Sequence, residues 1–161
     1  MAGINGGALL RLLFNLLWVV LGGLLMAVLW ALAGVLCAVT IIGIPWARAC
    51  FNIASFALWP FGREAISRRV LSGRGDIGTG LWGLVGNLLW LVLLGFWLAL
   101  GHLIAAAICA VTIIGIPFAW QHVKLAGLSL APIGAAIVDA PVAAEARRRA
   151  AGETVERLRR G

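Results

Sequence analysis

The feature that most constrains this chain is an internal duplication. The nine residues Cys37-Ala-Val-Thr-Ile-Ile-Gly-Ile-Pro45 recur letter for letter 72 positions later, as Cys109-Ala-Val-Thr-Ile-Ile-Gly-Ile-Pro117. The same offset relates Asn15-Leu-Leu-Trp18 to Asn87-Leu-Leu-Trp90. An internal repeat outranks other sequence signals in deciding architecture. We therefore expect the chain to consist of two copies of one structural unit.

The composition indicates that this unit lies in a membrane. Of the 161 residues, 63% are hydrophobic and 12% are charged, whereas soluble domains have about 25% charged residues. No charged residue occurs from position 12 to position 44, and a membrane-spanning helix needs about 20 apolar residues. A soluble chain of this size has too little interior to bury so much apolar surface. The solvent around most of the chain is therefore expected to be lipid.

Each copy is expected to fold into a helical hairpin that turns at the duplicated phrase. Gly43 and Pro45 interrupt the apolar run in the first copy, and Gly115 and Pro117 are their equivalents in the second. Proline is tolerated in the first turn of a helix but disrupts a helix interior. One helix should therefore end before each motif, and a shorter helix should begin at the proline. The expected helices cover residues of about 9–40, 45–59, 81–112 and 117–131.

The expected fold class is all-α: a multi-pass membrane protein with about four transmembrane helices, built as a tandem duplication of a helical-hairpin repeat. Two alternatives stay open. The chain could turn near Ala33-Gly34 and continue in a helix kinked at Pro45, or the short second helix of each copy could be re-entrant instead of spanning. The expected parts are a first membrane repeat (9–62), a basic linker (63–80), a second membrane repeat (81–138) and a basic tail (139–161).

The basic residues set the expected orientation. Ten of the thirteen Lys and Arg residues lie in the linker and the tail. Basic segments next to apolar blocks stay on the cytoplasmic side, so both termini and the linker are expected there, and the two repeats would share one orientation. Such segments also attract anionic lipids, which we favour over nucleic acid as the partner. Contact with lipid headgroups is expected at Arg63, Arg68, Arg69 and Arg74.

Three motifs together resemble a known family. They are Asn-x-x-Trp, Thr-Ile-Ile-Gly-Ile-Pro and Ala-Leu-Trp-Pro-Phe-Gly-Arg-Glu, in that order. The pattern is similar to that of the YccF family of small bacterial inner-membrane proteins with two copies of this unit, over roughly residues 12–138. The second copy departs from it, because Leu130-Ala-Pro-Ile-Gly134 lacks the Trp, the Phe and the Arg-Glu. The resemblance implies a fold and a location in the bacterial inner (plasma) membrane, but no biochemical activity.

The polar residues of the two short helices are candidates for a transport path. None of the six carboxylates lies within an apolar run, whereas proton and cation pathways normally need an intramembrane acid. We therefore expect an oligomeric channel or transporter for anions or small neutral solutes. In the alternative interpretation, the long basic side chains only reach up to the membrane surface. The candidate lining residues are Arg48, Asn52, Ser55, Gln121 and Lys124.

Catalysis is not expected, because the sequence contains no paired carboxylates for general acid–base chemistry. No metal or cofactor is expected either. His102 and His122 lack a companion at ligand spacing, so a role in hydrogen-bonded helix packing is favoured over metal binding or pH sensing. Cys37 and Cys109 are expected to be small packing residues.

The rival function is a membrane scaffold that transports nothing and binds anionic lipid or partner proteins through its basic linker and tail. A homo-oligomer is expected because four helices enclose little space alone.

Overall fold

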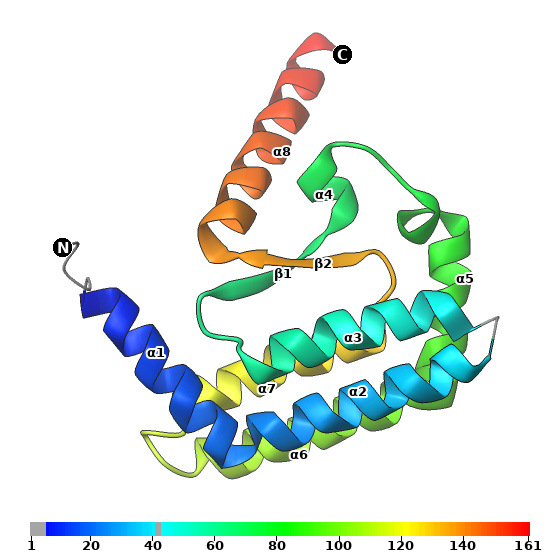
Figure 1. The fold of residues 1–161 in the computed structure, drawn as a ribbon. Helices are drawn as coiled ribbons and strands as arrows, with labels where there is room; N and C mark the ends of the chain where they lie inside the picture. The colour runs from blue at the N-terminus through cyan, green and yellow to red at the C-terminus, as the bar shows by residue number, and fades with distance from the viewer. Residues whose placement is uncertain (1–5, 41–42) are drawn as a thin grey trace, which may run out of the picture.

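The structure is a computed structural model that describes residues 6–40 and 43–161, and it is mostly helical (Figure 1). Two short strands join the helices. In chain order the elements are α1 (Gly6–Trp18), η1 (Val19–Gly23), α2 (Leu24–Val39), α3 (Ile44–Leu58), β1 (Arg63–Ser67), α4 (Arg68–Ser72), η3 (Ile77–Thr79), α5 (Leu81–Trp90), η4 (Leu91–Gly95), α6 (Phe96–Ala110), α7 (Ile116–Leu130), β2 (Ala135–Asp139) and α8 (Ala140–Arg160).

The tandem helical hairpins predicted from the repeat are confirmed. Helix α2 packs along α3, and α6 packs along α7. Pro45 and Pro117 lie in the first turns of α3 and α7. A Cβ atom at Gly43 would lie 2.2 Å from the carbonyl oxygen of Cys37, and one at Gly115 still closer to the equivalent oxygen. Only glycine therefore fits at these two turns.

The first long helix is not straight, although one helix was expected over residues 9–40. Gly22 interrupts it with φ 137°, a left-handed conformation that glycine adopts without a steric penalty. In the second copy Leu94 takes the equivalent position, and among the described residues no residue other than glycine has positive φ. The alternative turn near Ala33-Gly34 is wrong, because both residues lie inside α2.

The linker and the end of the second repeat contain the two strands, which the sequence did not predict. Strand β1 pairs with β2 in antiparallel register, and Ala65 lies opposite Ile137. These two residues are equivalent in the duplication, since 72 positions separate them. An antiparallel pair that joins equivalent residues places a two-fold axis between the strands, so the two repeats are related by this axis. The basic linker (63–80) therefore contains β1, α4 and η3.

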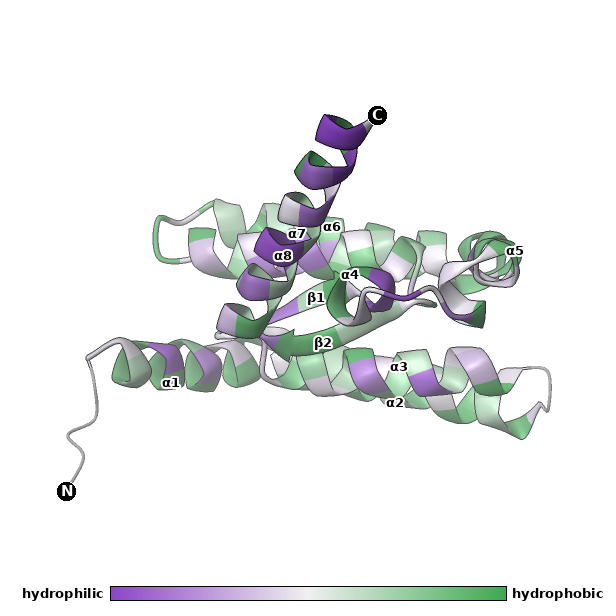
Figure 2. Cartoon of the chain, turned by 90° about the horizontal axis from the view of Figure 1, so that it is seen from above, coloured by the Kyte–Doolittle hydropathy of each residue, from purple (hydrophilic) through white to green (hydrophobic). Residues whose placement is uncertain are grey.

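The molecule has a polar side and an apolar side. The two-stranded ribbon lies over α3 and α7, with α4 and α8 beyond it and with α2 and α6 on the opposite side (Figure 1). Hydrophilic residues concentrate on α8, whereas α1, α2, α5 and α6 are largely hydrophobic (Figure 2). Side chains on these helices and on the short segments η1 and η4 are exposed, for example Val20 at 83%, Leu36 at 69% and Val92 at 76%. A surface of this kind suits contact with lipid chains.

Two helical stretches, Gly6–Val39 and Leu81–Ala110, are long and apolar enough to cross a membrane. Helices α3 and α7 have 15 residues each, which corresponds to about 22 Å. They are thus shorter than the hydrocarbon core of a bilayer, which is about 30 Å thick.

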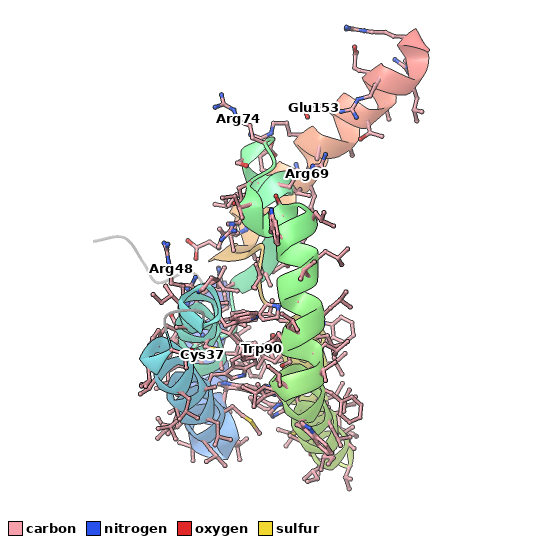
Figure 3. All side chains as sticks on the ribbon, turned by 90° about the vertical axis from the view of Figure 1, so that its right-hand side faces the viewer. Cys37, Arg48, Arg69, Arg74, Trp90 and Glu153 are labelled. Carbon is pink, nitrogen blue, oxygen red and sulfur yellow. The ribbon has the colours of Figure 1, made fainter. Side chains whose placement is uncertain are left out.

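Aromatic rings fill the space between the two hairpins. Trp30 stacks on Trp90 with ring centroids 6.0 Å apart, and Trp18 stacks on Phe118 at 6.3 Å. All four side chains are almost completely buried. Figure 3 shows this packed layer with Trp90 labelled. The contact between the repeats is therefore a hydrophobic core.

Candidate functional site

The repeated motif Asn-Leu-Leu-Trp fixes the start of each hairpin to its end. Asn15 is buried, its Nδ2 donates to the carbonyl oxygen of Phe61 at 3.0 Å, and its Oδ1 accepts from the amide of Phe61 at 2.9 Å. Asn87 makes the same pair of bonds to Ile133, at 3.0 and 2.9 Å. These bonds therefore hold the residue that follows each hairpin next to the asparagine in the helix that leads into it.

The tryptophan of the motif holds the second helix. Trp18 donates its indole N–H to the carbonyl oxygen of Ala57, and Trp90 donates to that of Ser129 at 2.8 Å. Sequence reasoning identified these residues as repeated but assigned them no role. The sequence feature that could have indicated this role is the repetition of an amide side chain and an indole N–H inside an apolar run, where each polar group needs a hydrogen-bond partner.

A chain of hydrogen bonds crosses the two-fold axis deep between the hairpins. Trp30 donates to Nε2 of His102 at 3.2 Å, and Nδ1 of His102 lies 3.2 Å from Nδ1 of His122. Because Nε2 of His102 accepts the hydrogen bond from Trp30, the ring proton of His102 is on Nδ1. Nδ1 of His102 then donates to Nδ1 of His122, which accepts. Both imidazoles are thus neutral in this arrangement. The residues that the structure describes hold no cluster of three metal-ligating side chains.

A pocket of about 430 Å³ lies on the polar side, between α3 of the first repeat and the segment that runs from η3 in the linker to α5 in the second repeat. Arg48 and Asn52 line it from α3, and Arg68 lines it from α4. The indole rings of Trp46 and Trp82 also line the pocket. The pocket therefore joins cationic side chains to aromatic ones at the boundary between the polar and apolar sides.

Arg68 is positioned for the pocket by Asp76. Its Nε lies 2.8 Å from Oδ2 of Asp76, and its Nη2 donates to Oδ1 at 3.3 Å. The hydrogen bond from Arg68 holds the pKa of Asp76 below its ordinary value of 3.8. Nη1 of Arg68 takes no part in this pair. Among the described residues Arg48 forms no ion pair, so its charge is available to a ligand.

The structure places the five residues expected to line a pore in different surroundings. Arg48 and Asn52 line the pocket, whereas Ser55 accepts a hydrogen bond from Arg63 at 3.2 Å. Gln121 is buried in α7 and its Oε1 has no partner among the described residues. Lys124, the equivalent of Asn52, is half-buried on the same helix. Of these five residues, Arg48 and Asn52 therefore share the pocket, and Ser55, Gln121 and Lys124 do not line it.

The basic residues of the linker and the tail gather on the polar side (Figure 3), where Arg69 and Arg74 are labelled near α8. Helix α8 is docked on the linker by two of its arginines. Arg147 pairs with Glu64, and Arg149 donates to the carbonyl oxygen of Leu71 at 2.7 Å. The residues expected to contact lipid headgroups therefore share one face with the tail.

Comparisons with known proteins agree with this geometry. The family pattern described as "Inner membrane component domain", YccF, matches residues 13–63 and 85–135. These ranges correspond to the two hairpins and include the anchoring pairs. The chain belongs to the YccF family. It is 35% identical over 141 residues to the inner membrane protein YccF of Escherichia coli strain K12, a match that covers 86% of this chain and 94% of the relative.

The YccF protein of Shigella flexneri gives the same figures of identity and coverage. No solved structure matches the chain. The resemblance inferred from the motifs is confirmed, and a YccF domain in each repeat accounts for the internal duplication. The relatives are named as inner-membrane proteins, which agrees with the exposed apolar face of this chain.

Proposed function

We propose that this YccF protein is a membrane-embedded scaffold that binds the phosphate headgroups of anionic lipids on its polar side. The pocket beside α3 carries the proposal. It offers Arg48, which has no ion-pair partner among the described residues, and Arg68, whose Nη1 takes no part in the pair with Asp76. Arginine binds phosphate oxygens with a planar set of donors, and indole rings favour the headgroup level of a bilayer.

The charge around the pocket supports the same function. The chain has a formal net charge of +7, and the linker and tail that carry most of it lie on one side. Each basic residue near an anionic membrane surface contributes about 1 kcal/mol of attraction. Orientation of this side toward the cytoplasm, where the leaflet is anionic, is part of the proposal.

A channel for anions or small neutral solutes remains the competing proposal. Within one chain the space between the hairpins is occupied by Trp18, Trp30, Trp90 and Phe118, so a pore would have to form between copies. The buried Gln121 with its unpartnered Oε1 is the observation that favours a polar path. An anion-flux assay on proteoliposomes, combined with the mass of the assembly in nanodiscs, separates the two proposals.

Native mass spectrometry of the purified protein tests lipid binding. Phosphatidylglycerol, which is anionic, should remain bound more strongly than phosphatidylcholine, which is zwitterionic. Because each arginine contributes about 1 kcal/mol, the Arg48→Gln/Arg68→Gln double variant should bind phosphatidylglycerol about 30-fold more weakly. Free inorganic phosphate as a competitor shows whether the phosphate alone or the whole lipid is recognised.

The matched control is an Arg157→Gln/Arg159→Gln variant, which removes the same charge from the exposed end of α8, away from the pocket. The attraction of the tail acts near a membrane surface, and native mass spectrometry detects bound lipid without a bilayer, so this variant should bind phosphatidylglycerol like the unchanged protein. Equal binding of the two lipids, or equal losses in the two double variants, would show that the pocket is not a headgroup site.

A further inference from the structure

We propose that both hairpins are re-entrant: each enters the bilayer and returns at the polar face, with α3 and α7 lying flat beneath the headgroups and with the apolar turn between α6 and α7 inside the hydrocarbon. The protein would then be held from one side of the membrane without crossing it. This inference concerns the contact between the protein and the lipid chains, and it does not depend on headgroup binding in the pocket.

The two ends of α3 lie at the same level. At its beginning, Trp46 donates to the carbonyl oxygen of Gly86 at 3.1 Å, near the start of the second repeat. Arg48, one turn later, shares the pocket with Arg68 of the linker. At its end, α3 leads to Phe61, which is bonded to Asn15. A spanning helix would place its ends on opposite membrane surfaces, whereas both ends of α3 adjoin the polar side.

Helix α7 repeats this arrangement around the two-fold axis. Phe118, near its beginning, contacts the rings of Phe14 and Phe61 with centroid distances of 6.0 and 5.6 Å. Phe61 lies two residues before β1 of the linker. At the end of α7 the chain reaches Ile133, which is bonded to Asn87. Both ends of α7 therefore lie close to the polar side as well.

The turn between α6 and α7 has the chemistry of a segment inside hydrocarbon. Val111, Ile113 and Ile114 are 84%, 87% and 76% exposed. Backbone groups in lipid need internal hydrogen-bond partners, and this turn supplies several. The amide of Gly115 donates to both the hydroxyl and the carbonyl oxygen of Thr112, each at 3.0 Å.

The distribution of charge agrees with this placement. No Asp, Glu, Lys or Arg occurs from position 77 to position 123, so the turn between α6 and α7, which lies within this stretch, has no directly adjacent charge to hold it in water on the far side. Helix α3 has one exposed polar face and one buried apolar face. Its exposed Arg48, Asn52 and Ser55 lie at the spacing of one helix face, while Ile53 and Phe56 are buried.

Cysteine accessibility tests the proposal in sealed, oriented membrane vesicles. The full-length protein carries Cys37→Ala, Cys50→Ala and Cys109→Ala, and a single cysteine is introduced as Ile114→Cys or, as the reference for the polar side, as Arg74→Cys. A membrane-impermeant maleimide should label Arg74→Cys from one side only. It should fail to label Ile114→Cys from either side of the intact membrane, because the reactive thiolate does not form in hydrocarbon. The same reagent should label Ile114→Cys after the membrane is dissolved in detergent.

Three outcomes decide the proposal. Absence of impermeant labelling at Ile114→Cys, with quenching by lipids brominated on the acyl chain of a bimane label attached in detergent before reconstitution, supports a turn inside the hydrocarbon. Impermeant labelling from the side opposite to Arg74→Cys would show that the hairpin spans the bilayer. Labelling from the same side as Arg74→Cys would show that the turn lies in water at the polar face. These outcomes do not change if lipid binding in the pocket fails its own test.

Discussion

Replacement of Asn15 by alanine should destabilise the first hairpin by about 2–3 kcal/mol. The side chain is 1% exposed and satisfies both the amide and the carbonyl group of Phe61. Each buried polar group left without a partner costs about 1–3 kcal/mol, which gives about 2–6 kcal/mol for the two. A pocket borders Asn15 and Phe61, so water replaces part of the loss and the lower end applies.

The free energy of unfolding can be measured by titrating detergent-solubilised protein with sodium dodecyl sulfate and following tryptophan fluorescence. The expected loss corresponds to a decrease of about 30- to 140-fold in the folding equilibrium constant. Asn87→Ala removes the equivalent bonds to Ile133 and should cost a similar amount. Asn52→Ala, at an exposed position, should cost less than about 0.5 kcal/mol. Equal small effects of Asn15→Ala and Asn52→Ala would refute the anchoring role.

Three further predictions concern the turn, the core and the linker. Gly115→Ala should destabilise the protein by about 2 kcal/mol or more, because the added Cβ would collide with a backbone carbonyl. In the control Gly101→Ala the added Cβ meets no atom within 4 Å, so this variant should stabilise the protein by about 0.5–1 kcal/mol in the same titration. Trp18→Phe should cost about 1–3 kcal/mol, because a buried carbonyl of α3 loses its donor; no change would contradict this bond. Arg68→Gln should raise the pKa of Asp76 in an NMR titration. The stability that this lowered pKa provides is present above pH 3.8 and is lost as the pH falls through the folded-state pKa. An unchanged pKa of Asp76 in the variant would contradict the pairing.

The hairpins could be predicted because their signals are local. A long apolar run, a glycine that cannot carry a Cβ at Gly43 and a proline at Pro45 determine where one helix ends and the next begins. The bend at Gly22 was missed because the apolar run continues through it, and a glycine inside such a run is often an ordinary packing residue. The difference between the copies, with Leu94 at the equivalent position, was the available sign that this glycine has a special conformation.

The candidate pocket could be predicted only in part. Arg48 and Asn52 stood out as polar residues in a short apolar helix, and Arg68 stood out as part of a basic linker. Their presence in one pocket depends on how the linker folds back over α3. The sequence interpretation assigned Arg48 and Arg68 to different sites, because the distance between them is not encoded in either segment alone.

The sequence by itself determined the duplication, the helical hairpins, the apolar character and the excess of positive charge in two segments. These properties follow from residues close together in the chain. Only the tertiary structure decided that β1 pairs with β2, that Trp30 meets His102 across the two-fold axis, and that both ends of α3 adjoin the polar side. Each of these contacts joins one repeat to the other. Their geometry depends on how the two copies pack, and neither copy by itself carries a local signal of that arrangement.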